Sequence, residues 1–263
     1  MDVKRIITGI MILVIIVIVS VFYTLNYNSP LLPMTAGERS LRRLYIIKSY
    51  DPENDLYTSF IPAIVNSIVW DFRALDTYFE TIVFFTALIS ALAIYHEYLI
   101  EAKWDREKLS PIPMRISKLI LPMTFSISIA IVIKSMVSPG GGFQGGALAA
   151  LSIYVIIYVH SSSYLIGKLN HSLLLFIRSI AILCISFLAI LPLLNIIMGD
   201  CYGYLFQIYS KPECDFGALI NIYGGSVSLV PLIYNVFEYL AIFSGFTLLL
   251  LIIIIGGYRE RIS

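Results

Sequence analysis

Long uninterrupted apolar blocks constrain this chain more than any other feature. The first is ITGIMILVIIVIVSVFYTLN, residues 6–25, and it follows Lys4 and Arg5. At about 1.5 Å per residue, blocks of about 20 residues can cross a hydrocarbon core about 30 Å thick. Five further blocks have this length: residues 79–100, 116–137, 144–166, 173–198 and 233–257. The pattern predicts an all-α integral membrane protein with about six transmembrane helices.

Composition agrees with a multi-pass protein of the cell membrane. Of the 263 residues, 59% are hydrophobic and only 13% are charged, whereas a soluble domain carries about 25% charged residues. The net charge of +1 gives no indication of a nucleic-acid partner. No small-x-small cleavage site follows the first block, so we expect a retained anchor rather than a signal peptide.

The distribution of Lys and Arg predicts that both termini lie inside, with a long first outer loop. In that topology the outer charges fall mainly in the first loop, and loops of that length carry little topological information. The charges assigned to inner segments are Lys4, Arg5, Lys103, Arg106, Lys108, Arg115, Lys118, Lys168, Arg178, Arg259 and Arg261.

The chain divides into two predicted parts. Residues 1–104 form a two-span module, residues 105–112 (DREKLSPI) a charged linker, and residues 113–263 a four-span domain. The outer segment Phe216–Tyr234 is half apolar, and the sequence leaves open whether it lies on the membrane surface or re-enters the membrane.

Two of the three cysteines, Cys201 and Cys214, fall in one predicted outer loop. An oxidising exterior would permit a disulfide between them, and two free thiols are the alternative. Cys184 lies inside a span, where we expect inert packing. No Cys or His spacing indicates a metal site, and no cofactor is expected.

A glycine-rich stretch, SPGGGFQGGALAAL, interrupts the apolar sequence at Ser138–Leu151. Pro139 cannot donate a helical hydrogen bond and ends the preceding span. Glycines permit positive φ and a sharp reversal, and small residues four apart let helices approach closely. A phosphate-binding loop is the disfavoured alternative, because no GK[ST] ending follows. The stretch therefore predicts a corner and a packing face formed by Pro139, Gly140, Gly141, Gly142, Gly145 and Gly146.

Charged residues near or inside the spans are functional candidates, because lipid disfavours them. Arg73, Asp76 and Glu80 lie at i, i+3 and i+7 and share one face of a continuous helix, whereas Asp71 points elsewhere or the helix breaks there. A structural ion pair and a carboxylate that loads a proton or Na+ are both open readings.

Two further charges belong to the same outer half of the membrane in the predicted topology. Lys134 lies roughly 6 Å and Glu238 roughly 8 Å from the outer surface, at 1.5 Å per residue. Lys134 could instead extend its ammonium to the surface. The common depth predicts one ion path that contains Asp71, Arg73, Asp76, Glu80, Lys134 and Glu238.

The motif PGGGFQGG at the start of a span resembles the B subunit of multi-subunit Na+/H+ antiporters of the Mrp/Mnh family (MnhB). Similar modules occur in membrane-bound hydrogenase and sulfane sulfur reductase complexes of archaea. The resemblance covers roughly residues 113–260, and its span count matches. Relatives usually carry a His shortly before the Pro; this chain has KSMVSPGGG, with Lys134 and no His.

A second motif, IVWDFRALDTYFETIVFFTAL (Ile68–Leu88), resembles the carboxy-terminal end of the antiporter A subunit. Its equivalent in the hydrogenase complexes is a separate small E-type subunit, MbhE. This resemblance covers roughly residues 1–100 and keeps the charged positions Arg73, Asp76 and Glu80. The two motifs in this order indicate a natural fusion of neighbouring subunits.

The resemblances imply a non-catalytic membrane subunit of a cation/proton antiporter that helps to form the Na+/H+ path and to assemble the complex. Its partners would be other small membrane subunits, the lipid bilayer, Na+ and H+. The alternative is an accessory subunit of a redox-driven ion pump of the hydrogenase or sulfur reductase type.

Overall fold

The computed structural model of the protein describes residues 40–53, 57–101, 111–160, 170–198, 202–210, 214, 216–222 and 224–259. Contacts divide the chain into two compact units, Met1–Arg43 and Leu44–Ser263, and the second unit contains every element discussed below from α3 onward. The predicted first span, residues 105–110 of the predicted linker and Cys201 lie outside the described residues.

Helices dominate the described part of the chain. They are α2 (Ser40–Ser49), α3 (Ile64–Ser67), a π-helical turn η1 (Ile68–Phe72), α4 (Ala74–Glu101), α5 (Pro111–Lys134), α6 (Gly142–His160), α8 (His171–Met198) and α9 (Val230–Arg259). Four of them, α4, α5, α8 and α9, are long and apolar enough to cross a membrane, and α6 contains a shorter apolar helix, Gly142–Ile157. The predicted all-α membrane fold is confirmed.

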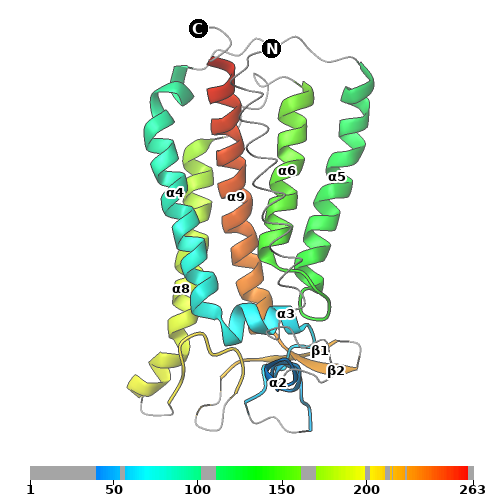
Figure 1. The fold of residues 1–263 in the computed structure, drawn as a ribbon, viewed down its shortest axis with the longest axis vertical. Coiled ribbons are helices and arrows are strands. Elements are labelled where there is room, and N and C mark those ends of the chain that lie inside the picture. Colours follow the sequence, from blue (N-terminus) through cyan, green and yellow to red (C-terminus); the bar gives the residue numbers. More distant parts are fainter. Residues whose placement is uncertain are drawn as a thin grey trace, which may run out of the picture. The chain divides into compact units, whose positions relative to one another are not determined.

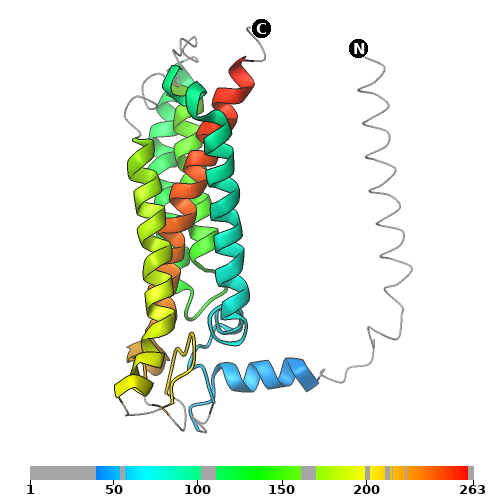
Figure 2. The same ribbon diagram turned by 90° about the vertical axis from the view of Figure 1, so that its left-hand side faces the viewer.

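Helix α9 is the centre of the second unit. It packs against α4, α5, α6 and α8, and Figures 1 and 2 show these helices running side by side with α9 among them. Half of the apolar window of α9 is buried within the chain, compared with 11% of the window of α4. Half of the side chains in this window of α9 are therefore covered by the rest of the chain, and among them are the polar residues Asn235 and Glu238.

The close packing of α6 depends on residues that lack bulk. A Cβ added at Gly146 would lie 2.7 Å from the carbonyl oxygen of Tyr239 on α9. A Cβ added at Gly145 would lie 2.9 Å from the carbonyl oxygen of Ser128 on α5. The backbone of α6 thus approaches both neighbouring helices at adjacent glycines. Ala149, one turn further on, is fully buried.

The chain bends sharply before α4. The turn η1 ends at Phe72, and Arg73 has φ −131° and ψ 30°, which lies outside the helical region. In Figure 1, α3 consequently lies crosswise at the end of the upright α4. The sequence left open whether Asp71 lies on a continuous helix or before a break. The structure shows the break, at Arg73 between Asp71 and α4.

The segment Phe216–Tyr234, which the sequence left open, contains a β-hairpin. Strands β1 (Leu219–Ile222) and β2 (Gly225–Ser228) pair antiparallel, with Leu219 opposite Ser228. The hairpin leads directly into α9. Just before it, Cys214 is disulfide-bonded, whereas Cys184 in α8 is a free thiol. Pairing of Cys214 with Cys201 stays a prediction.

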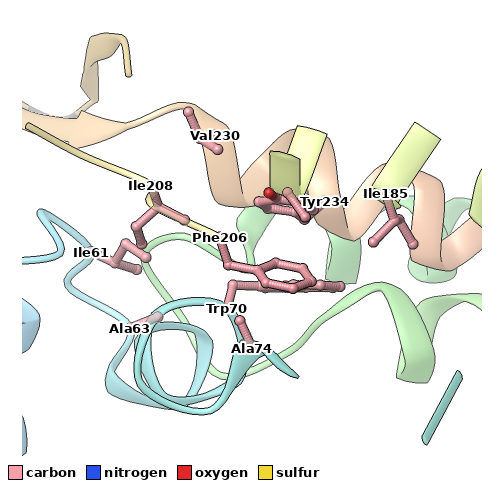
Figure 3. Close-up of a cluster of buried hydrophobic side chains, with 10 residues drawn as sticks. Ile61, Ala63, Trp70, Ala74, Ile185, Phe206, Ile208, Val230 and Tyr234 are labelled. Carbon is pink, nitrogen blue, oxygen red and sulfur yellow. The ribbon is translucent and has the colours of Figure 1, made fainter. Parts of the chain in front are cut away.

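An aromatic cluster joins the bend to α9 (Figure 3). The rings of Trp70 and Tyr234 stack with their centroids 4.7 Å apart and their planes 10° apart. Phe206, from the loop after α8, lies 5.8 Å from the Tyr234 ring. Trp70 and Tyr234 are fully buried. This cluster anchors η1 against the first turns of α9, where the polar residues of the site are found.

The glycine packing of α6 is tested by Gly146→Ala. Because its Cβ would meet backbone atoms of α9, we expect the variant to lose about 1–3 kcal/mol of unfolding free energy, which is typical of overpacking. The matched control is Gly141→Ala, whose nearest obstacle is the movable Gln144 side chain at 3.0 Å. Thermal unfolding of the detergent-solubilised complex should show the larger loss for Gly146→Ala; equal losses would contradict the packing argument.

Candidate functional site

A cavity of about 250 Å³ lies where the bend, the glycine-rich turn and α9 meet. Its volume is sufficient for several water molecules or a hydrated cation. Four segments contribute to its wall: α3 with η1, α4, the turn into α6, and α9. The lining residues are Val65, Asn66, Val69, Thr77, Glu80, Gly140, Gly141, Phe143, Gln144, Asn235 and Glu238.

Asn235 joins the segments around the cavity. Its Oδ1 accepts hydrogen bonds from Trp70 Nε1 (2.9 Å) and from the backbone N–H of Gly142 (3.1 Å). Its Nδ2 donates to Asn66 Oδ1 (2.9 Å) and to Ser135 Oγ (2.9 Å). An amide side chain has two donor hydrogens and an oxygen with two lone pairs, so Asn235 uses its complete capacity. The side chain is fully buried.

Glu238 lies about one helical turn beyond Asn235 and is only 4% exposed. Its Oε2 accepts a hydrogen bond from the backbone N–H of Phe143 at 3.1 Å. This N–H belongs to the first turn of α6, where backbone donors are free and the helix dipole is positive. The carboxylate of α9 is thus held by the amino-terminal end of α6.

The glycine turn gives Glu238 access to that helix end. A Cβ added at Gly142 would lie 2.3 Å from the carbonyl oxygen of Asn235 and 2.8 Å from Oε2 of Glu238. Of the three consecutive glycines, only Gly140 has positive φ, +156°. The expectation that all three serve the reversal is therefore too broad: Gly140 makes the turn, and Gly142 permits close contact.

A second carboxylate, Glu80, lines the same cavity from α4. Its side chain is exposed, and it shares the cavity wall with Glu238. Like charges that share a site repel each other, so a proton or a cation between them lowers the electrostatic energy. The side chains of Asn66 and Gln144 add neutral polar groups to the wall.

The other residues of the predicted ion path do not line the cavity. Arg73 and Asp76 form an ion pair on the exposed side of the start of α4. Asp71 accepts a hydrogen bond from Ser59 Oγ. Lys134 ends α5 with an exposed side chain. Of the predicted ion path, Glu80 and Glu238 share the cavity wall.

Sequence reasoning missed the amides of this site. Asn66, Gln144 and Asn235 are neutral, so the membrane cost that singles out charged residues does not identify them. An Asn at the start of an apolar span, as at Asn235, was the available signal. It also counted Arg178 only among the charges of inner segments. The structure places Arg178 within α8, fully buried, where α4 and α9 contact it.

Together, the fold and the cavity define a multi-pass membrane protein that carries a carboxylate-lined polar site among its helices. The family profile for domains related to the MnhB subunit of Na+/H+ antiporters matches residues 112–248, and the chain belongs to this family. The predicted resemblance to the antiporter B subunit is thereby confirmed.

Two solved structures have a similar fold. One is a chain of the Mrp complex from Dietzia sp. DQ12-45-1b, with a TM-score of 0.59 and 14% identity, over 94% of this chain and 26% of that one. This chain thus spans about a quarter of that chain's length. The other is a chain of the membrane-bound sulfane sulfur reductase, an archaeal respiratory membrane complex, with a TM-score of 0.59 and 21% identity, over 94% and 96% of the two chains. No curated protein matches the sequence.

The role of Asn235 is tested by Asn235→Ala. The substitution leaves Trp70 and Gly142 with buried N–H groups that lack acceptors, and each such group costs about 1–3 kcal/mol. We expect the unfolding free energy of the solubilised complex to fall by about 3 kcal/mol or more.

The matched control for this variant is Asn221→Ala on the exposed face of β1, where Asn221 accepts a hydrogen bond from Ser226. Surface changes of this kind stay within about 0.5 kcal/mol. Similar losses in the two variants, measured by thermal unfolding, would show that Asn235 does not hold the segments together.

Proposed function

We propose that this chain is a non-catalytic membrane subunit of a multi-subunit cation/proton antiporter, and that its cavity forms part of the Na+/H+ path. The observation that carries the proposal is the presence of two carboxylates from different helices, Glu80 and Glu238, on one polar cavity. Ionisable groups at membrane depth are costly and usually serve ion or proton transfer. Family membership supports the antiporter assignment.

The two carboxylates have different environments, which suits different roles. Glu238 is buried and tied to the end of α6, so it is a fixed ligand. Glu80 is exposed at the cavity, so it can exchange its proton or cation with the surroundings. Asp76, about one turn before Glu80, and its ion-pair partner Arg73, three residues earlier, would tune the local charge on the approach to the cavity.

The position of the cavity mouth supports a role within a complex. The exposed lining residues include Glu80 on α4 and both Phe143 and Gln144 on α6. Lipid would not solvate a carboxylate that is exposed among membrane helices. A neighbouring membrane subunit would cover the mouth and continue the path. The partners would therefore be other small membrane subunits of the complex.

A second function, an accessory subunit of a redox-driven ion pump, is favoured by one observation. The structural match extends over 96% of the sulfur reductase chain but only 26% of the Mrp chain. In that setting the same cavity would move ions, and an electron-transfer arm outside this chain would supply the energy.

The carboxylates are tested by Glu80→Gln and Glu238→Gln in the assembled complex. Each substitution keeps the side-chain volume and removes the charge that attracts a cation or accepts a proton. We expect Na+/H+ exchange in inverted vesicles to fall roughly tenfold, equivalent to about 1.4 kcal/mol in the barrier. Glu53→Gln, an exposed loop carboxylate outside the cavity, should leave the flux unchanged. Unchanged fluxes in both cavity variants would refute the proposal.

The choice between the two functions is tested by purifying the native complex through an affinity tag on this chain. For a stand-alone antiporter we expect only membrane subunits without redox centres. Co-purification of nickel- or iron–sulfur-containing subunits, identified by mass spectrometry and metal analysis, would assign the chain to a redox-driven pump instead.

A further inference from the structure

Arg178 is a second polar centre, separate from the cavity. It lies in α8 seven residues after His171 and is fully buried. Its guanidinium carbon lies 4.4 Å from the ring centroid of Phe84 and 5.4 Å from that of Phe85, both on α4. Nη1 donates a hydrogen bond of 2.7 Å to the carbonyl oxygen of Ala241 on α9. The guanidinium therefore occupies the seam between α4, α8 and α9.

The seam is shaped to admit the guanidinium. A Cβ added at Gly245, one turn after Ala241, would lie 1.7 Å from Nη1 of Arg178. Any side chain at this position would displace the guanidinium. The absence of a side chain on this turn of α9 thus provides the space for a buried charge in the middle of a bundle of membrane helices.

Most of the hydrogen-bonding capacity of Arg178 is unused within the described part of the chain. Nε and Nη2 are both buried and have no hydrogen-bond partner there. A buried donor without an acceptor lowers the free energy of unfolding. A buried charge without a counter-charge lowers it further. Ordered water is the usual partner of such groups. The donors therefore indicate a ligand with acceptor oxygens.

The candidate counter-charges are few. In the described membrane-spanning windows, the acidic residues are Asp76, Glu80 and Glu238. Gly245, which lies against Nη1 of Arg178, follows Glu238 by seven residues on α9, and Phe84 follows Glu80 by four residues on α4. At about 1.5 Å per residue these axial offsets are about 10 Å and about 6 Å. Along the two helices, Arg178 thus lies about two turns beyond Glu238 and about one turn beyond Glu80.

Aromatic side chains connect the two centres. The Phe84 ring, which contacts Arg178, lies 5.0 Å from the ring of Phe246. Phe246 lies 5.9 Å from Phe143, which lines the cavity. In such an apolar surrounding the electrostatic interaction between charges is much stronger than in water. A charge on the carboxylates would therefore be felt at Arg178.

We propose that Nε and Nη2 of Arg178 bind water molecules in the α4–α8–α9 seam, and that Arg178 is the counter-charge of the Glu80–Glu238 pair. The inference deepens the proposed ion path. A fixed positive charge one to two turns beyond the carboxylates would also repel a cation from that end of the cavity. Its test uses stability and structure rather than flux, so its failure can be told apart from failure of the proposed transport.

The test is a double-mutant cycle with Arg178→Gln and Glu238→Gln, read as the Tm of the assembled complex. Arg178→Gln alone should lower Tm by several degrees, because it leaves the carboxylates without their counter-charge. In the double variant, we expect at least half of that loss to be regained. Arg178→Lys, which keeps the charge, should retain most of the wild-type Tm. The control pair, Arg178→Gln with Glu53→Gln, should be additive.

Additive losses in the Arg178–Glu238 cycle would overturn the proposed coupling and leave Arg178 a purely structural residue. If Arg178→Gln does not assemble, the wild-type complex provides the second measurement. A cryo-EM map that resolves water should show density within about 3.2 Å of Nε and Nη2. Density that instead shows these donors dry, or paired with a carboxylate of another subunit, would also overturn the proposal.

Discussion

The rest of the structure depends on the hydrogen bonds of one buried amide, Asn235. A membrane interior offers no water to backbone groups, so helix ends and bends at that depth need protein partners. Asn235 supplies such a partner to the backbone N–H of Gly142 in the first turn of α6. It also ties the side chains of Trp70, Asn66 and Ser135 to the same point. With these bonds in place, an irregular backbone can surround a polar cavity without exposing its own polar groups to lipid.

Close packing and charge placement then have one common cause. Gly142 allows the start of α6 to approach the α9 backbone closely, and this proximity brings the Phe143 N–H within 3.1 Å of Glu238. The positive end of α6 holds the carboxylate in place of solvent. The glycines that permit helix contact also bring the polar groups of the site together. The PGGGFQGG motif therefore serves both as a tight corner and as part of the candidate site.

Sequence reasoning predicted what depends on local patterns. Apolar block lengths identified the spans from α4 to α9, and membrane depth singled out Glu80 and Glu238, which share the cavity. It could not predict which helix faces meet. Lys134 has a similar predicted depth but lies at the exposed end of α5, and Asp71 is diverted by the break at Arg73. Pairing across elements, such as Trp70 with Asn235, has no signature in a single sequence.

Arg178 shows why a charge count along the sequence can mislead. At the start of an apolar block, an Arg is normally read as a loop or interfacial residue. The missing side chain at Gly245, far along the chain on another helix, makes its burial possible. Burial then demands acceptor oxygens for Nε and Nη2, and the nearest carboxylates along α4 and α9 are the cavity pair. Thus the features that exclude lipid from Arg178 also make its charge relevant to Glu80 and Glu238.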